Sequence, residues 1–299
     1  MNGIINIYKE KGYTSHDVVA KMRGILKMKK IGHTGTLDPD AEGVLPVCIG
    51  KATKLVDLIT DKDKTYEAVL KLGITTDTQD ITGTVLKTKE VTATPPEIEA
   101  GIKGFIGEYM QLPPMYSAIK VNGKRLYELA RQGKEVERKR RKVSIHDIRI
   151  LEMNEEAHEV TMAVDCGKGT YIRTLLHDIG ETLGCGGTMK SLTRTAVGSF
   201  KLEDAYPLAE IEELVQNGRI ETAILPTEDI LSNYLKVTVA KEYNKLIYNG
   251  NAFYNNQLTE PVRRQSGEWV RVYDSDDHFI GIYQYDFDKA YYRPVKMFL

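Results

Sequence analysis

The sequence is poor in the residues that cross-link small domains or hold metal ions. Its 299 residues include only three cysteines, and none of them belongs to a CxxC pair. The six histidines show neither HxxxH nor HxxEH spacing. The sequence therefore predicts neither a disulfide framework nor a zinc site.

Long apolar runs are absent as well, since no run approaches the roughly 18 apolar residues of a membrane-spanning helix. The opening residues 1 to 8 lack the charged and then apolar layout of a signal peptide. Because 41% of the residues are hydrophobic, the chain is long and apolar enough for one large domain and a small one. We expect a cytoplasmic globular protein.

The chain has almost no net charge, −1 at neutral pH, which argues against a uniformly basic nucleic-acid binder. The charges are nevertheless unevenly placed. Residues 120 to 142 hold ten Lys or Arg and three Glu, a balance of +7, so the remaining chain carries −8. Residues 203 to 229 hold eight carboxylates and the single Arg219. A basic cluster suits a polyanion bound on one face, although a charge run alone is more often a solvated loop.

Strand-like and helical segments are interleaved along the first two thirds of the chain. Strands are expected at residues 3–8, 44–49, 66–72, 143–151 and 159–166. Helices are expected from residue 14 or 15, over 53–59, from 95, over 124–131 and from 170. Because several strands follow each other without a helix between them, we predict an α+β fold with a mixed, mostly antiparallel sheet flanked by helices.

The pattern changes near residues 232 to 234. From there to residue 299 the chain is rich in Tyr, Asn and Gly, with short strand-like pieces at 269–273 and 279–283. We therefore expect one domain over residues 1–232 and a second, small β-rich domain over residues 235–299.

A glycine-rich loop over residues 32–43 holds Asp38 directly before Pro39. Proline disfavours the helical region for the residue before it and donates no hydrogen bond. The Asp38 carboxylate is thus presented by a stiff, non-helical loop, the kind of segment that often carries catalysis. An Asp before Pro is also ordinary turn material, so this motif alone leaves both interpretations open.

Two further residues could join Asp38. Tyr66 begins a strand, where its ring could project from the strand's end, although such a Tyr is usually half-buried packing. Arg173 falls in the first turn of a helix, where the helix dipole opposes a cation, so an anionic partner is indicated. The alternative for Arg173 is a solvent-facing side chain.

His33 and Lys9 are less specific candidates. His33 could carry a proton, bind a metal or fill space, and no second metal ligand lies near it in the sequence. Lys9 and a basic helix face with Lys21, Lys27 and Lys29 could meet phosphates or only water. These patterns predict an aspartate site beside a basic surface and do not name a reaction.

Several blocks resemble one family. Residues 30 to 47 read Lys-Ile-Gly-His-Thr-Gly-Thr-Leu-Asp-Pro-Asp-Ala-Glu-Gly-Val-Leu-Pro-Val and resemble the signature of TruB-type tRNA pseudouridine synthases. Further blocks stand in the family's order at residues 14–19, 50–54, 64–66, 113–131, 167–173 and 192–200. Ordered blocks at this density, over roughly residues 3 to 205, are far more specific than any single motif.

The resemblance implies the pseudouridine synthase fold and the isomerisation of uridine 55 in the T-loop of tRNA, without cofactor or metal. Asp38 would be the essential carboxylate as the N-glycosidic bond breaks and the uracil rejoins through C5. Tyr66 would stack on the flipped uracil and lie where a base could take the proton from C5. Arg173 would pair with Asp38 and keep it ionised and oriented.

The resemblance also assigns the surroundings of these residues. Tyr171 and Leu192 would line the pocket, and His33 would fill the space that the flipped nucleotide leaves in the T-loop. A basic, RNA-clasping insertion is implied at about residues 120–145, and residues 235–299 look like a PUA-type module that would touch the acceptor end. The implied partner is tRNA, bound by a monomer without a membrane. The basic residues expected to contact RNA in the insertion are Lys120, Arg138, Lys139, Arg140, Arg141 and Lys142. Outside the insertion, Lys9 is also expected to contact RNA.

Two positions depart from the family pattern. Glu10 follows Lys9 where the family usually has proline, which could loosen the support under the site. Thr193 stands where an arginine is common beside Arg194, which could remove one phosphate contact.

Two other functions fit parts of the pattern. A tRNA-binding folding factor with secondary or lost catalysis would have no need for the combination of Asp38, Tyr66 and Arg173. A carbohydrate-cleaving enzyme would need Asp38 and Glu42 to face one cleft, and the basic insertion argues against it. The sequence leaves open whether Asp38 attacks covalently or abstracts a ribose proton.

Overall fold

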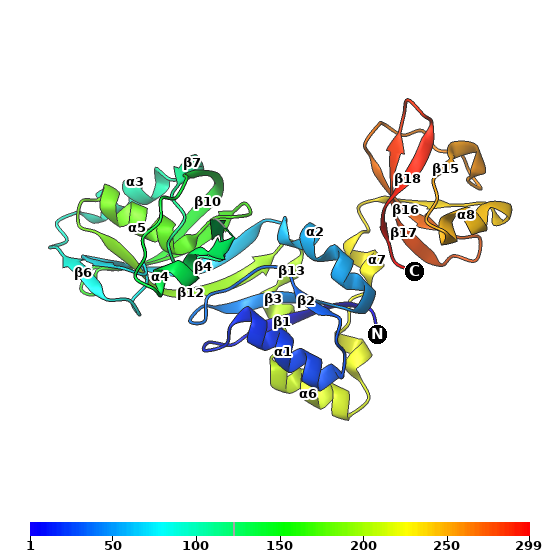
Figure 1. The fold of residues 1–299 in the computed structure, drawn as a ribbon. Coiled ribbons are helices and arrows are strands. Elements are labelled where there is room, and N and C mark those ends of the chain that lie inside the picture. The colour runs from blue at the N-terminus through cyan, green and yellow to red at the C-terminus, as the bar shows by residue number, and fades with distance from the viewer. Residues whose placement is uncertain (122) are drawn as a thin grey trace.

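The computed structural model describes residues 1–121 and 123–299. Asn122, which falls in the predicted RNA-clasping insertion, lies outside the described residues. Figure 1 shows a long body made of the elements from β1 to α7 and a smaller β-rich body that carries the C-terminus. Among the described residues, no helix is both long and apolar enough to cross a bilayer.

The strands form two main sheets and two short hairpins. Their bounds are β1 (Gly3–Lys9), β2 (Ile31–His33), β3 (Glu42–Ile49), β4 (Lys64–Leu72), β5 (Ile74–Thr76), β6 (Val85–Thr88), β7 (Gly107–Gln111), β8 (Lys120–Val121), β9 (Lys124–Arg125), β10 (Arg141–Asn154), β11 (Glu159–Cys166), β12 (Gly187–Val197), β13 (Phe200–Lys201), β14 (Leu235–Thr238), β15 (Phe253–Tyr254), β16 (Trp269–Tyr273), β17 (Phe279–Asp286) and β18 (Tyr291–Met297).

The helices are short. The α-helices are α1 (Ser15–Leu26), α2 (Val56–Thr60), α3 (Pro95–Lys103), α4 (Leu126–Ala130), α5 (Ile172–Thr182), α6 (Leu208–Gln216), α7 (Thr227–Ile230) and α8 (Asn244–Tyr248). The 3-10 helices are η1 (Gly50–Leu55), η2 (Leu202–Asp204), η3 (Ile220–Ala223), η4 (Lys241–Tyr243) and η5 (Asn255–Gln257).

The larger sheet runs in the order β1-β3-β12-β4-β11-β10-β7, with β2 paired to β3 and β13 paired to β12. Within its described strands, the pair β3–β12 is parallel and the other pairs are antiparallel. This confirms the predicted α+β class with a mixed, mostly antiparallel sheet. Because β3 and β12 are hydrogen-bonded neighbours, residues about 150 positions apart in sequence are brought into one place.

Helix α1 shows why the sequence pattern predicts its element well. The Thr14 hydroxyl accepts a hydrogen bond from the Asp17 backbone N–H at 3.0 Å, and Asp17 accepts one from the Thr14 N–H at 2.8 Å. This capping box satisfies two donors that a helix start leaves free. Helix α1 ends at Leu26, and the next residue, Lys27, has φ of 50°. The buried face contains Val18, Val19, Met22 and Leu26.

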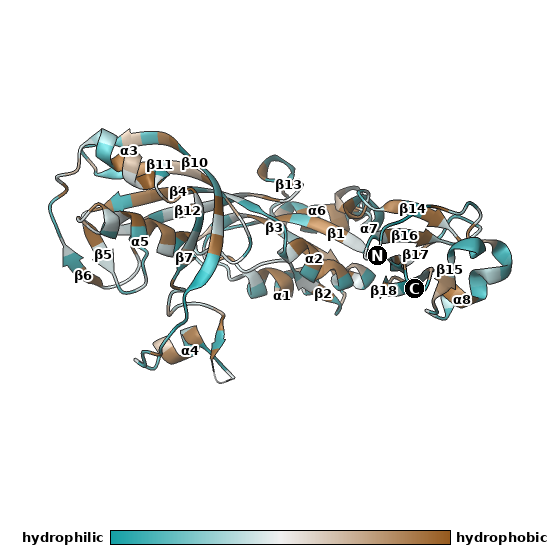
Figure 2. Ribbon diagram, turned by 90° about the horizontal axis from the view of Figure 1, so that it is seen from above, coloured by the Kyte–Doolittle hydropathy of each residue, from teal (hydrophilic) through white to brown (hydrophobic). Residues whose placement is uncertain are grey.

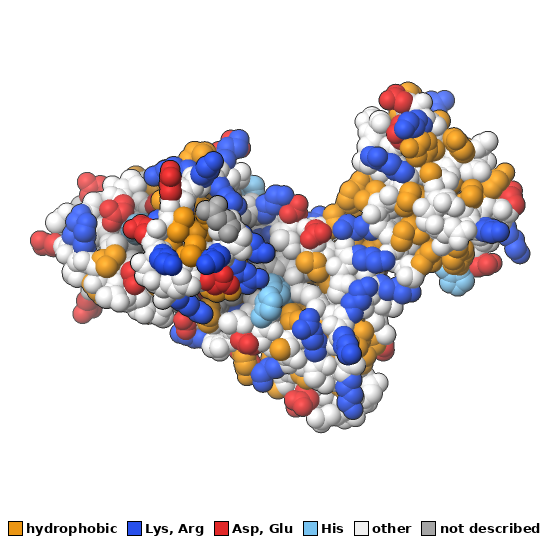
Figure 3. Space-filling model, viewed as in Figure 1, with side chains coloured by type: hydrophobic (Ala, Val, Ile, Leu, Met, Phe, Trp, Pro, Cys, Tyr) orange, Lys and Arg blue, Asp and Glu red, His pale blue; other side chains and the backbone are white. Residues whose placement is uncertain are grey.

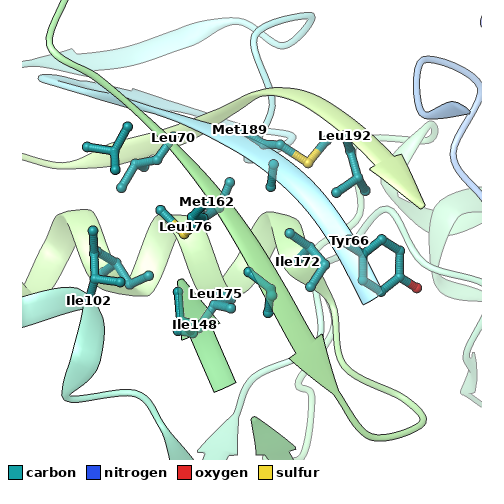
Figure 4. Close-up of a cluster of buried hydrophobic side chains, with 14 of the residues drawn as sticks. Tyr66, Leu70, Ile102, Ile148, Met162, Ile172, Leu175, Leu176, Met189 and Leu192 are labelled. Carbon is teal, nitrogen blue, oxygen red and sulfur yellow. The ribbon is translucent and has the colours of Figure 1, made fainter. Parts of the chain in front are cut away.

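Helix α5 and strands β4, β11 and β12 enclose one hydrophobic core. Leu175, Leu176 and Ile179 of α5 are fully buried against Leu70 of β4 and Met162 of β11, as Figure 4 shows for most of them. Burying each such side chain contributes roughly 2 kcal/mol. The apolar side chains of this helix thus form a core face that fixes the position of its first turn.

Two predicted helices are shorter in the structure. Residues 53–59 are divided between the 3-10 helix η1 and the single-turn α2. The start of the predicted helix over 124–131 instead forms β9, which pairs with β8 across Gly123. Gly123 has φ of 82°, a turn conformation that glycine adopts at little cost. Helix α4 therefore begins only at Leu126.

The smaller body contains a five-stranded sheet in the order β14-β16-β17-β18-β15. It has its own core around Phe253, Tyr283 and Tyr292, whose rings lie close together. A further cluster joins it to the larger body, since Ile282 and Phe298 pack with Leu55 and Ile59.

Candidate active site

The Asp38 loop links β2 to β3 and is anchored at two points before Asp38. The Thr34 hydroxyl donates to the Pro46 carbonyl at 3.1 Å, and the Leu37 N–H donates to the Ser15 hydroxyl at 2.9 Å. Thr34, Ser15 and Leu37 are all buried. Asp38 itself lies outside any helix or strand, as its position before proline predicts, and it follows directly on the buried Leu37 anchor.

Arg173 meets Asp38 in a two-point contact. The Nε of Arg173 lies 2.9 Å from one carboxylate oxygen of Asp38, and Nη2 donates to the other at 3.2 Å. The Arg173 side chain is only 5% exposed, whereas that of Asp38 is 38% exposed. The planar guanidinium thus fixes the plane of a carboxylate that remains open to an incoming group.

Further acceptors hold the Arg173 guanidinium. Nη1 donates to the Thr78 carbonyl at 3.0 Å, and Nη2 donates to the Tyr116 carbonyl at 2.7 Å. The Asp80 carboxylate lies 3.6 Å from Nη1, and its side chain is 17% exposed. Two carboxylates therefore share one buried cation, with Asp80 on the side away from solvent. Sequence reasoning missed Asp80, because the polar loop that carries it looks like ordinary turn material.

The charges around Asp38 act in opposite directions. Burial raises the pKa of the Asp38 carboxyl above its ordinary value, and the Arg173 guanidinium acts against this rise. Asp80 adds to the rise because a second negative charge disfavours ionisation. The predicted role of Arg173, to favour the ionised carboxylate, is thus one of several opposing effects.

Tyr66 and Leu192 belong to the same buried cluster as Leu37, the residue before Asp38. Tyr66 on β4 is 8% exposed and Leu192 on β12 is 7% exposed. Figure 4 shows Tyr66 at one end of the buried cluster, with its hydroxyl directed away from the cluster and Leu192 nearby. Burial raises the pKa of the Tyr66 phenol, so this group stays protonated at neutral pH.

Tyr171 immediately precedes α5 and is held through its backbone. Its N–H donates to the side chain of Gln111 at 2.8 Å, and its carbonyl accepts from the same amide at 3.0 Å. Gln111 is 1% exposed and ends β7. This clamp fixes the start of α5 and with it Arg173, and the sequence carried no signal for it.

Arg194 is a second buried cation that the sequence analysis did not assign to the site. Its side chain is 1% exposed, its Nε donates to the Val44 carbonyl at 2.7 Å, and Nη2 donates to the Gly35 carbonyl at 3.4 Å. Gly43 has φ of 104°, and a Cβ there would lie 2.3 Å from the Arg194 carbonyl oxygen. Only glycine fits this approach, so Gly43 and Arg194 together hold the Asp38 loop against β12.

The structure contradicts the prediction that Lys9 contacts RNA. The Lys9 side chain is fully buried, and its Nζ donates to the carbonyls of Ala41 at 2.5 Å, Pro39 at 3.1 Å and Glu10 at 3.1 Å. Burial lowers the pKa of Lys9 to about 8. Lys9 therefore supports the Asp38 loop from within. Because the Glu10 carbonyl takes part, Glu10 in place of proline leaves this support intact.

His33 lies at the edge of the same loop and is partly buried. Its Nδ1 accepts a hydrogen bond from the Gly35 N–H at 3.4 Å. The His33 ring packs edge-on against His16, with 5.3 Å between centroids. Burial lowers the pKa of His33, which favours the neutral ring. This surrounding fits a role in shape more than in proton transfer.

Some basic side chains of the insertion already bind other groups of the protein, and others do not. Arg138 donates to the Pro113 carbonyl at 3.0 Å, and Arg140 donates to the Met110 carbonyl at 2.9 Å. Lys142 forms an ion pair with Glu108 at 2.8 Å. The exposed members of the predicted set are Lys120, Lys139, Arg140, Arg141 and Lys142, while Arg138 is partly buried. Arg141 and Lys142 lie in β10 of the main sheet, so the part of the insertion that leaves this sheet ends at residue 140.

Thr193, the other departure from the family pattern, lies beside the Asp38 loop. It pairs in register with Glu42 at the junction of β12 and β3, and its hydroxyl lies 3.4 Å from the Glu42 carboxylate. Within residues 1–121 and 123–299, no three His, Cys, Asp or Glu side chains are arranged to hold a metal ion.

Comparisons with known proteins assign this geometry to a family. A model described as TruB family pseudouridylate synthase (N terminal domain) matches residues 23–172. A second, described as tRNA pseudouridylate synthase B C-terminal domain, matches residues 173–232. The chain belongs to the TruB family. Its members are pseudouridine synthases, so this protein is an isomerase that converts uridine to pseudouridine in tRNA.

Relatives support this membership of the TruB family along the whole chain. A protein of Lachnoclostridium phytofermentans named tRNA pseudouridine synthase B is 60% identical and covers 100% of both chains. One of the same name from Alkaliphilus oremlandii is 50% identical over 94% of this chain and 92% of the relative. The resemblance inferred from the sequence blocks is thereby confirmed.

Solved structures support the fold of this TruB-family chain. An archaeal box H/ACA Nop10–Cbf5 complex matches with a TM-score of 0.73 and 26% identity, over 99% of this chain and 86% of that chain. A structure of an H/ACA RNP bound to a substrate RNA containing 2′-deoxyuridine matches with a TM-score of 0.74 and 25% identity, over 99% and 85%.

Proposed function

We propose that this TruB-family protein isomerises uridine 55 in the T-loop of tRNA, with Asp38 as the essential carboxylate and without metal or cofactor. The observation that carries the proposal is the two-point contact of Arg173 with Asp38. It orients a carboxylate that is partly exposed on a loop anchored by buried side chains. A carboxylate that served only to cap the turn would not need this buried cation.

The reaction breaks the bond from C1′ to N1 of the uracil and forms a bond from C1′ to C5. The C5 proton must leave, and N1 gains a proton. Asp38 acts on the ribose while the glycosidic bond is broken, either by attack at the sugar or by taking a ribose proton. Burial and the charge of Asp80 raise the pKa of Asp38, whereas Arg173, aided by the charge of Lys9, lowers it and favours the ionised Asp38 that either route requires.

The pocket residues receive the uracil in this proposal. Tyr66, Tyr171 and Leu192 provide aromatic and apolar surfaces that replace the stacking lost when a base leaves its helix. The raised pKa of Tyr66 argues against an ionised phenol as the base that takes the C5 proton. His33, neutral and packed against the loop, fills the space vacated by the base.

Two further parts of the protein would hold the tRNA. The insertion supplies Lys120, Lys139 and Arg141 to RNA phosphates, together with the tied side chains of Arg138, Arg140 and Lys142. We propose a division into a catalytic domain over residues 1–232 and a PUA-like domain over residues 235–299 that touches the acceptor stem. The protein would act as a monomer on cytoplasmic tRNA.

The proposal is tested by tritium release from tRNA that carries label at uridine C5. We expect Asp38→Asn to lower the rate of release by roughly 10²- to 10⁴-fold, because a neutral amide replaces the reacting carboxylate. Asp40→Asn is the matched control, because Asp40 is an exposed carboxylate of the same loop. Equal release from wild type and Asp38→Asn would contradict the assignment. Retained tRNA binding without release by wild type would favour a folding factor instead.

A further inference from the structure

A second basic surface lies outside the insertion and outside the active site. We call it the α1–η1 basic surface, and all of its side chains are exposed. It consists of Lys21, Arg23, Lys27, Lys29, Lys30, Lys51 and Lys54. The sequence segments that carry it contain no acidic residue. Residues 18–37 contain five Lys or Arg and no Asp or Glu, and residues 43–56 contain two Lys and no Asp or Glu.

The fold brings the two sequence segments of this surface together. Strand β2 pairs with β3, and the Gly50 N–H donates to the Lys30 carbonyl at 2.8 Å. Lys30 and Lys51 are therefore neighbours, and the left-handed Lys27 turns the chain from α1 toward them. Lys54 donates to the Met297 carbonyl at 2.5 Å, so the surface reaches the last strand of the smaller body.

The side chains of this surface are not neutralised. Over the described part of the chain, no ion pair joins any of the seven to a carboxylate. Unpaired charges on adjacent elements repel each other, which costs stability unless an anion is bound. Their arrangement thus favours a polyanionic partner.

The surface stands at a fixed distance from Asp38. Ser15, in the first turn of α1, accepts a hydrogen bond from Leu37 beside Asp38. Lys27 follows Ser15 by twelve residues. Because a helix rises about 1.5 Å per residue, Lys27 lies roughly 18 Å from Ser15. Figures 1 and 2 show α1, β2 and α4 on the same side of the molecule, and Figure 3 shows Lys and Arg side chains over both regions of that face.

We propose that the α1–η1 basic surface binds the phosphate backbone of a double-helical arm of the tRNA, away from the loop that enters the active site. This inference rests on the proposed function and adds a second contact region to it. The basic insertion and the α1–η1 basic surface then hold the RNA on two sides of the Asp38 loop.

The chemistry of the surface favours helical RNA over a membrane. Lysines are flexible point charges that contact phosphates without reading bases, which suits the regular backbone of a helix. Peripheral membrane binding also needs apolar side chains that enter the lipid. None of the exposed large apolar side chains of the described chain belongs to residues 18–56.

The proposal is tested with Lys29→Gln, Lys30→Gln and Lys51→Gln combined in one variant. We expect the Kd for full-length tRNA to rise roughly tenfold at moderate salt, and the slope of log Kd against log salt to fall by roughly 2 to 3. The single-turnover rate at saturating tRNA should not change. A stem–loop with the target loop and only a few base pairs should bind the variant and wild type equally.

The matched control combines Lys87→Gln, Lys103→Gln and Lys201→Gln, three exposed lysines on other elements, and should leave both the Kd and the salt slope unchanged. An unchanged salt slope in the test variant would overturn the proposal. So would an equal loss for the short stem–loop, or a loss of binding to phosphatidylserine vesicles with tRNA binding intact. Pseudouridine formation by wild type is measured separately, so its absence would count against the proposed function and not against this surface.

Discussion

At the scale of single residues, Asp38 is the outer member of a row of three charges. The Arg173 guanidinium lies between Asp38 and Asp80, with contacts of 2.9 Å and 3.6 Å respectively. Asp80 is itself fixed, because its other oxygen accepts from the Thr82 N–H at 3.0 Å and the Thr78 hydroxyl at 2.8 Å. Asp80 therefore positions the cation that positions Asp38.

We expect Asp80→Asn to lower the single-turnover rate of pseudouridine formation by roughly 10- to 100-fold, because Arg173 loses a fixed anchor. The same change removes a negative charge that raises the pKa of Asp38. The pKa of Asp38 should fall, so Asp38 stays ionised to lower pH. The acid limb of the pH–rate profile should consequently move to lower pH, while KM for tRNA changes little.

Asp77→Asn is the matched control for this prediction. Asp77 is an exposed carboxylate of the same loop and accepts a hydrogen bond from the Thr84 N–H at 2.8 Å. It should leave both the rate and the acid limb in place. If Asp80→Asn slowed the reaction without moving the acid limb, the electrostatic part of this explanation would be wrong.

The sequence predicted the central pair but not its supports. Asp38 and Arg173 stand in recognisable blocks, so the resemblance placed them although 135 positions separate them. Asp80 and Gln111 have no local pattern that marks them, since each acts through a contact made only after β4, β12 and α5 are assembled. Lys9 was misjudged because a lysine near the start of a chain is usually exposed, whereas here three carbonyls satisfy its ammonium.

At the scale of elements, amphipathic helices and alternating strands were predictable, and short connecting elements were not. Helix α1 has a capping box and a clear apolar face, and both appear in the structure. Residues 53–59 and 124–131 have weaker patterns, and their conformations depend on pairing with other segments. The basic insertion is similar, because the sequence shows its charges but not which of them are already bound to the protein.

We expect Lys139→Gln with Arg141→Gln to weaken tRNA binding and to flatten the salt slope by roughly 2, since each change removes a phosphate contact. No ion pair joins Lys139 or Arg141 to a carboxylate in the described structure. Arg141 also lies near the pocket, because its charge acts on the pKa of the Tyr171 phenol. The measurement is tRNA affinity by fluorescence anisotropy over a range of salt concentrations.

Lys142→Gln is the control for the insertion, because Lys142 already pairs with Glu108. It should change the salt slope by less than one free lysine would. A salt slope that stays constant in the double variant would identify the insertion as a solvated surface, the alternative that charge runs usually favour.

At the scale of the whole molecule, the two bodies share an apolar contact. Phe298 is 7% exposed and stacks on Phe279 with 5.2 Å between ring centroids. Both belong to or pack against the cluster that contains Leu55 and Ile59 of the larger body. An apolar contact of this kind restricts the motion of the two bodies relative to each other. It also places the β-rich body next to the α1–η1 basic surface.

The single tryptophan reports on this contact, since Trp269 packs against the same cluster and lies 5.6 Å from the Tyr234 ring. In wild type we expect urea unfolding followed by Trp269 fluorescence and by far-UV circular dichroism to coincide. Phe298→Ala should cost about 3 to 5 kcal/mol at the contact, so the fluorescence transition should move to lower urea than the dichroism transition. Phe287→Ala, which removes a 64% exposed ring of the same body, should change neither. Transitions that shift together in Phe298→Ala would show instead that the two bodies unfold as one unit.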